Sequence, residues 1–155
     1  KRYQSTAELA VALLAFAPKR SRAVAERAMT MMQRATGQHV VFDSLPPEDR
    51  ARVAILTSNY GEAAAIDFFG PRYGLPKAIC PHQSYFLWGP RACTGEVVLR
   101  VGEPLEDIRS SYASVVVAAP LDNPNGFFYE NRPILLCRGL KTNLQTAWPE
   151  LKKWE

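Results

Sequence analysis

Two short stretches contain most of the side chains that could take part in chemistry. Residues 57–62 read Thr-Ser-Asn-Tyr-Gly-Glu, and residues 80–90 read Cys-Pro-His-Gln-Ser-Tyr-Phe-Leu-Trp-Gly-Pro. Aromatic rings beside hydroxyl, amide and imidazole groups suit a sugar, whose C–H faces stack on rings while its hydroxyls form hydrogen bonds. The candidate ligand-binding residues are Ser58, Asn59, Tyr60, Glu62, His82, Gln83, Ser84, Tyr85 and Trp88.

The first stretch also has a structural interpretation. A Ser or Asn just before a helix caps its free N–H groups, and an acidic residue in the first turn interacts favourably with the helix dipole. Ser58 or Asn59 would then be the cap and Glu62 the acidic residue. A single glycine, Gly61, forms neither a dinucleotide fingerprint nor a phosphate-binding loop. Local residue types favour capping over ligand binding and leave both open.

Catalytic arrangements have less support in the sequence. Ser84, His82 and Asp67 are the residue types of a serine hydrolase, and Glu62 with His82 would form an acid–base pair. No G-x-S-x-G motif surrounds Ser84. A metal site built from His39, His82 and acidic residues is weaker still, because no cysteine pair has zinc-ligand spacing. We therefore expect no catalytic residue, no metal and no cofactor in this chain.

Apolar runs alternate with helix-like segments along most of the chain. The run at 53–56 is apolar without alternation, which is typical of a strand covered on both faces. Strands are expected at 39–42, 53–56, 78–80, 97–101, 115–118 and 134–137, and helices at 44–50, 62–69, 105–112 and 144–154. This order predicts an α/β fold with an open, largely parallel sheet of about five strands and flanking helices, a Rossmann-like layering. Each of the two stretches follows a predicted strand, and the two should meet if those strands are neighbours in a parallel sheet.

The first part of the chain reads as helical. Ser5 with Glu8 forms a capping box, and a second helix is expected to stop at Gly37. We expect one domain, with a helical segment at 1–37 and an α/β core at 38–155.

Composition excludes some functional classes. The 155 residues are 47% hydrophobic and 22% charged, as in globular domains, and not as in disordered chains. The net charge of +4 comes from scattered basic residues, so a nucleic-acid partner is not expected, whereas an anionic membrane or phosphorylated lipid is compatible. The longest apolar run, 9–17, is shorter than the about 20 residues that span a membrane. The first residue is Lys1, so we expect part of a longer protein.

Three cysteines are present, which is an odd number. Cys80 and Cys137 lie at the ends of apolar runs, where a cysteine commonly packs as a small hydrophobic residue. The disulfide state of these two and of Cys93 is left open.

Residues 54–76 and 84–90 resemble a stretch of bacterial membrane glycosyltransferases related to the dolichyl-phosphate-mannose–protein mannosyltransferases. The matching segments read Ala-Ile-Leu-Thr-Ser-Asn-Tyr-Gly-Glu-Ala from residue 54 and Ser-Tyr-Phe-Leu-Trp-Gly-Pro from residue 84. The family usually has Gly and Asn where this chain has Pro81 and Gln83. Residues 137–141, Cys-Arg-Gly-Leu-Lys, resemble the closing segment of the family.

The resemblance implies an architecture and a role. Such proteins have a multi-helix membrane region with the catalytic carboxylates, and a soluble C-terminal α/β domain on the extracytoplasmic side. They take lipid-phosphate-linked sugars as donors. This chain would then be a non-catalytic accessory domain at the periplasmic face. Its partners would be the transmembrane region of the same polypeptide and a glycan or lipid-phosphate-linked sugar. A stand-alone carbohydrate-binding module and a small serine hydrolase are the alternatives.

Overall fold

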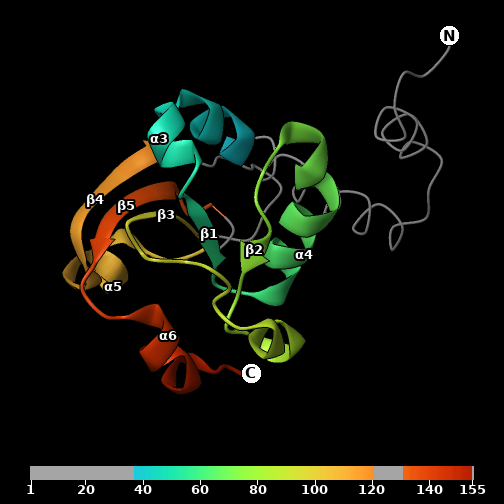
Figure 1. The fold of residues 1–155 in the computed structure, drawn as a ribbon, viewed down its shortest axis with the longest axis vertical. Helices are drawn as coiled ribbons and strands as arrows, with labels where there is room; N and C mark the ends of the chain where they lie inside the picture. Colours follow the sequence, from blue (N-terminus) through green and yellow to red (C-terminus); the bar gives the residue numbers. More distant parts are fainter. Residues whose placement is uncertain (1–36, 121–130, 155) are drawn as a thin grey trace, which may run out of the picture.

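Five strands form one open sheet in the computed structural model, which describes residues 37–120 and 131–154 (Figure 1). The sheet order is β2-β1-β3-β5-β4. β1 pairs in parallel with β2 and β3, whereas β5 pairs antiparallel with β3 and β4. Four of the five strands therefore run in one direction. The strands are β1 (Ala54–Thr57), β2 (Ala78–Ile79), β3 (Val97–Val101), β4 (Tyr112–Ala119) and β5 (Ile134–Leu140).

Short helices connect the strands. The α-helices are α3 (Pro47–Arg50), α4 (Tyr60–Phe69), α5 (Leu105–Ile108) and α6 (Leu144–Ala147). The 3₁₀ helices are η2 (Gly70–Tyr73), η3 (Gln83–Trp88), η4 (Arg109–Ser111) and η6 (Trp148–Leu151). These helices flank the sheet, and the predicted α/β class with an open, mostly parallel sheet is confirmed. No helix in 37–120 or 131–154 is both long enough and apolar enough to cross a membrane.

The strand predicted at 39–42 is wrong, because residues 37–44 are helical. Gln38, Val41 and Leu45 are buried while Val40 is 63% exposed, which is the spacing of a helix with one face on the core. The predicted stop at Gly37 is wrong for the same reason, since Gly37 lies within this helix. The helices predicted before it lie outside the described residues.

Two other predicted helices are shorter in the structure. The helix expected at 144–154 divides into α6 and η6, because Pro149 has no amide hydrogen to continue the α-helical pattern. The helix expected at 105–112 stops early, because Tyr112 pairs with Leu140 and begins β4.

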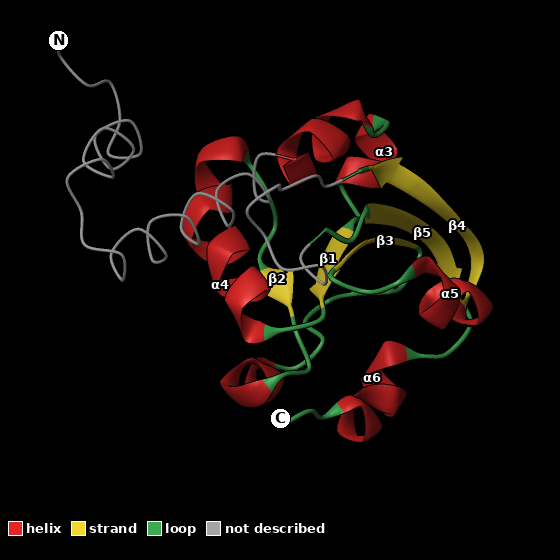
Figure 2. Cartoon of the chain, turned by 180° about the vertical axis from the view of Figure 1, so that it is seen from behind, coloured by secondary structure: helices red, strands yellow, loops and turns green. Residues whose placement is uncertain are grey.

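Both faces of the sheet are buried. On β3, Val97, Leu99 and Val101 face the cluster that α4 covers through Ile66. Val98 faces the opposite cluster. That second cluster is closed by Ile108 of α5, Leu144 of α6 and Trp148 of η6. Seen from behind, α4 lies beside β2 and β1, while α5 and α6 lie toward the other strands (Figure 2).

The three cysteines are buried, free thiols. Burial raises the pKa of Cys80 and Cys93 above the ordinary value, and raises that of Cys137 to about 11. A protonated, buried thiol is a poor nucleophile. Cys80 and Cys137 therefore act as small hydrophobic residues, as predicted.

Candidate functional site

The loops that follow β1, β2 and β3 meet at one edge of the sheet. These three strands are mutually parallel neighbours, so their carboxyl ends lie side by side. The rings of Tyr60, after β1, and His82, after β2, have centroids 5.2 Å apart and are tilted by 55°. The prediction that residues 57–62 and 80–90 meet is confirmed for Tyr60 and His82.

Ser58, Asn59 and Glu62 form the start of α4. Asn59 is the N-cap, with an extended backbone, and its Oδ1 accepts a hydrogen bond from the Glu62 amide at 3.0 Å. The Glu62 carboxylate accepts hydrogen bonds from the Ser58 amide at 3.2 Å and the Ser58 hydroxyl at 3.0 Å. This reciprocal arrangement resembles a capping box. The capping interpretation of the sequence is confirmed.

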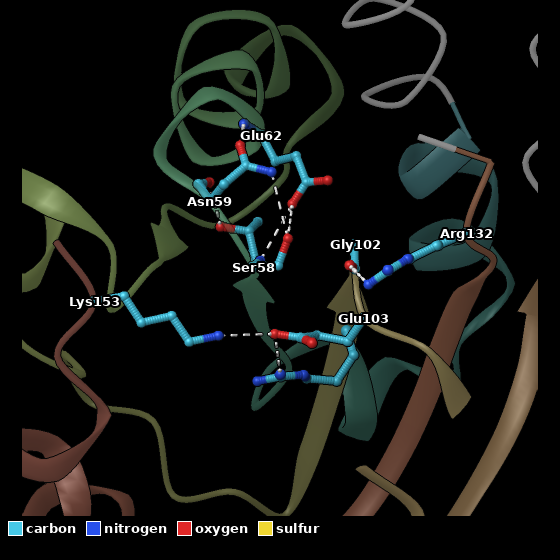
Figure 3. Close-up of polar contacts among 9 residues, drawn as sticks. Ser58, Asn59, Glu62, Gly102, Glu103, Arg132 and Lys153 are labelled. Carbon is cyan, nitrogen blue, oxygen red and sulfur yellow. Dashed lines mark hydrogen bonds and ion pairs between the residues drawn. The ribbon is translucent and has the colours of Figure 1, made fainter. Parts of the chain in front are cut away.

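Gly102, just after β3, completes this arrangement (Figure 3). Its φ is +82°, and a Cβ at this position would overlap the Ser58 hydroxyl and the Glu62 carboxylate. Glu62 is only 4% exposed. We call Ser58, Asn59, Glu62 and Gly102 the capping cluster. Because the capping cluster already places a carboxylate at the N-terminus of α4, that terminus is not a free anion site.

A second polar group lies beside the capping cluster. Glu103 Oε1 forms ion pairs with Arg100 at 3.3 Å and with Lys153 at 3.4 Å. Arg132 donates a hydrogen bond from Nη1 to the Gly102 carbonyl oxygen at 2.8 Å. Sequence reasoning missed all four of these charged residues. Glu103 follows the predicted strand at 97–101, so its position at a strand end is the sequence signal that points to it.

Lys153 reaches this edge because the C-terminal segment pairs with the loop after β2. The Gln83 amide donates to the Lys153 carbonyl oxygen at 2.9 Å, and the Lys153 amide donates to that of Pro81 at 3.0 Å. The Gln83 side chain donates to the Trp154 carbonyl oxygen at 2.6 Å. Gln83 is therefore occupied in holding the chain terminus beside His82. No local sequence signal indicates this long-range pairing.

Tyr60 and His82 remain as the ring pair of the edge. The Tyr60 side chain is 53% exposed. His82 Nε2 is buried and has no hydrogen-bond partner within the described ranges. Tyr60 thus presents its ring to solvent beside the imidazole of His82. On the neighbouring segments, the Asn59 amide bonds to Ser58 and the Lys153 ammonium pairs with Glu103 (Figure 3).

Tyr85 and Trp88 form a separate group. Their ring centroids are 4.4 Å apart in an edge-to-face arrangement, and the Tyr85 hydroxyl donates to Asp67 at 3.5 Å. Burial and the nearby Asp67 carboxylate raise the pKa of Tyr85 to about 12. In the part of the chain that the structure describes, no ring contact or hydrogen bond joins Trp88 to Tyr60 or His82. The nine predicted residues therefore do not converge on one point.

The serine hydrolase residues are not assembled. Asp67 Oδ1 accepts a hydrogen bond from the Ala78 amide at 2.8 Å, which supports the start of β2. Ser84 is exposed, and no hydrogen bond joins it to the imidazole of His82. Across residues 37–120 and 131–154, no three His, Cys, Asp or Glu side chains are grouped as metal ligands would be.

The Tyr60 ring at this edge is open to a ligand, whereas the Asn59 amide and the Lys153 ammonium already have partners within the protein. Among the residues that the structure describes, the edge brings together no nucleophile and base. In comparisons with known proteins, no family model, no curated protein and no solved structure matches this chain.

Proposed function

We propose that this chain is a non-catalytic, ligand-binding accessory domain of a membrane glycosyltransferase that uses lipid-phosphate-linked sugars. It binds a glycan or the sugar acceptor at the carboxyl edge of the sheet. The observation that carries the binding role is the exposed Tyr60 ring beside His82, at the ends of two parallel strands. Ligands of open α/β sheets bind at this edge.

The chemistry of the edge suits a sugar. The face of an exposed aromatic ring packs against sugar C–H groups, and the Tyr60 hydroxyl can form hydrogen bonds with sugar hydroxyls. The Lys153 side chain is 51% exposed and is paired with Glu103, so it would exchange that carboxylate for a ligand phosphate. Such an exchange would favour a phosphorylated sugar over a neutral one.

The glycosyltransferase context is supported by the sequence resemblance at 54–76 and 84–90. We therefore propose the extracytoplasmic face of a bacterial membrane as the location and the transmembrane region of the same polypeptide as a partner. Catalysis is assigned to that region and not to this domain, which agrees with the separated Ser84, His82 and Asp67.

The binding role is tested by titrating the isotope-labelled protein with mannose, glucose, N-acetylglucosamine and their 1-phosphates, followed by NMR. We expect saturable shifts in the amides of 59–61 and 82–83. Tyr60→Ala should weaken binding about tenfold, which corresponds to about 1.4 kcal/mol for one ring contact. Phe68→Ala is the matched control, because Phe68 is a 79% exposed ring on the same helix.

Unchanged binding in Tyr60→Ala, or an equal loss in Phe68→Ala, would contradict this site. The catalytic assignment has its own test. Sugar transfer from a short-chain prenyl-phosphate sugar by the isolated domain would overturn the accessory role.

A further inference from the structure

Several exposed apolar and basic side chains lie on η3 and the C-terminal segment. Leu87 is 73% exposed, Trp88 56% and Trp154 53%. The Lys152 ammonium lies 4.5 Å from the Trp154 ring centroid and 5.2 Å from that of Phe86, so it bridges the two segments. In both overall views the short helix after β2 lies beside the C-terminus (Figures 1 and 2). We call this surface the η3 corner and define it by Leu87, Trp88, Arg91, Lys152 and Trp154.

The η3 corner is held in place by the fold. Phe86 stacks on Trp148 with ring centroids 5.6 Å apart, and the Trp148 indole donates to the Phe86 carbonyl oxygen at 2.9 Å. Arg91 Nε donates to the Ala78 carbonyl oxygen at 3.2 Å. The Arg91 guanidinium also lies 5.9 Å from the Trp88 ring centroid. The exposed side chains are therefore presented by an ordered backbone, and little further order is lost when a partner binds.

The two charged members of the η3 corner, Arg91 and Lys152, are basic and lie over its aromatic rings. Residues 81–93 contain Arg91 and no acidic residue. In the C-terminal segment at 148–155, Lys152 and Lys153 lie between the acidic residues Glu150 and Glu155 in the sequence. Tryptophan and leucine next to Lys and Arg are the composition of protein surfaces that lie at the membrane–water interface.

We propose that the η3 corner docks on an anionic phospholipid surface. Leu87 and Trp88 enter the interfacial region, while Arg91 and Lys152 contact lipid phosphates. This inference goes beyond the proposed glycan binding and does not depend on it, because it uses different side chains. Docking through this corner would leave the neighbouring Tyr60 edge close to the membrane surface.

Vesicle co-sedimentation tests the proposal with the whole chain. We expect binding to vesicles of phosphatidylcholine with about 30 mol% phosphatidylglycerol. The surface potential of such vesicles is negative, roughly −30 mV. Binding to pure phosphatidylcholine should be much weaker, and added salt should weaken binding to the anionic vesicles. Lys152→Gln should lower the partition coefficient about fivefold, because one basic residue near such a surface is worth about 1 kcal/mol.

Leu87→Ser tests the apolar half of the η3 corner and should also lower partitioning about fivefold, for partial burial of one leucine. Phe68→Ser removes an equally exposed apolar side chain on α4, and Arg109→Gln removes an exposed charge on η4. Both controls should bind as the wild type does. Thermal unfolding of each variant confirms that it folds.

The proposal would be overturned if the wild type did not bind anionic vesicles, or if the Phe68→Ser and Arg109→Gln controls lost as much vesicle binding as Leu87→Ser and Lys152→Gln. It would also be overturned if the wild type formed a dimer that Leu87→Ser dissociates and did not bind vesicles. The last result would assign the η3 corner to a second copy of the chain. Loss of sugar binding in Tyr60→Ala with normal vesicle binding would leave this proposal intact, so the two proposals fail separately.

Discussion

The capping cluster and the η3 corner both contain residues that follow strands of the sheet, but the side chains of the first point inward and those of the second point outward. Ser58 and Glu62 are turned inward, bonded to each other and packed on Gly102. Leu87 and Trp88 are turned outward on an ordered turn. Polar residue types at a strand end are therefore a poor guide to ligand binding, because a helix start needs the same types.

Gly102→Ala should have the largest effect on stability. The added Cβ would overlap Ser58 and Glu62, and the φ of +82° is strained for any residue with a Cβ. We expect a loss of about 3 kcal/mol in the free energy of unfolding, measured by urea denaturation. Gly74→Ala is the control, because Gly74 has a similar φ of +69° but nothing within 4 Å of its Cβ. It should lose only about 1 kcal/mol from backbone strain.

If Gly102→Ala and Gly74→Ala lose equal stability, the close packing of Ser58 and Glu62 on Gly102 adds nothing to the free energy of unfolding. The capping cluster would then have room for an added Cβ. The η3 corner should stay functional in Gly102→Ala below its melting temperature, so vesicle binding provides an internal check.

Glu62→Ala should have the next largest effect. It removes the acceptor that Ser58 uses twice, at a buried position. We expect a loss of about 2 kcal/mol in unfolding free energy, because the Ser58 hydroxyl loses its bond to a charged acceptor, while the Ser58 amide keeps the Val101 carbonyl oxygen at 3.1 Å. Glu106→Ala is the matched control in the first turn of α5, where the side chain is exposed, and it should change stability by less than about 0.5 kcal/mol. Sugar binding that disappears in Glu62→Ala while stability is unchanged would show that Glu62 contacts ligand instead.

Asn59→Ala should cost about 1 kcal/mol, the usual value of an N-cap. Asn59→Asp should restore most of that stability, because an aspartate oxygen can accept the same hydrogen bond from the Glu62 amide. Thermal unfolding of the three proteins measures both changes. Failure of aspartate to restore stability would mean that Asn59 acts through its amide donor and not as a cap.

Asp49 should contribute less to the free energy of unfolding than Glu62 does, and its contribution should depend on pH. Hydrogen bonds and charge from Arg138, and then from Arg52, hold the pKa of Asp49 below its ordinary value of 3.8. A lowered pKa in the folded state stabilises the protein above the unfolded-state pKa, and this contribution is lost as the pH falls through the folded-state pKa. Both arginine side chains are more than 40% exposed, so solvent screens the pairs.

Urea unfolding of wild type and Asp49→Asn between pH 7 and pH 3 tests this contribution. The stability difference should be constant from pH 7 to about 5 and should shrink below about 4. A difference that does not change with pH would show that the Asp49 charge is not involved.

The α/β class and most strands of the sheet could be predicted from the sequence. The helix at 37–44 and the direction of β5 could not. The strands at β1, β3 and β5 were predictable, because runs such as Val97–Val101 are apolar and short. The segment at 39–42 was not, because Val40 and Val41 favour a strand locally, while packing of Val41 and Leu45 on the core makes the segment helical. The antiparallel course of β5 was also out of reach, because it depends on pairing between distant segments.

The candidate site divides in the same way. Local rules identified Asn59 and Glu62 as a helix start and placed Tyr60 near His82. They did not identify Lys153, which reaches the edge only through backbone pairing with Pro81 and Gln83. Residues that are far apart in the sequence are joined here by hydrogen bonds that no local pattern encodes.

NMR mapping of two ligands on one labelled sample separates the structural capping cluster from the exposed binding surfaces. The first ligand is the sugar that binds in titration, and the second is an anionic bicelle. We expect two separate sets of shifted amides: 59–61 with 82–83 for the sugar, and 86–89 and 91 with 152–154 for the bicelle. The amides of Glu62 and Gly102 should shift little with either. A single set of amides that responds to both ligands, or no saturable response to either, would contradict the division between a structural capping cluster and exposed binding surfaces.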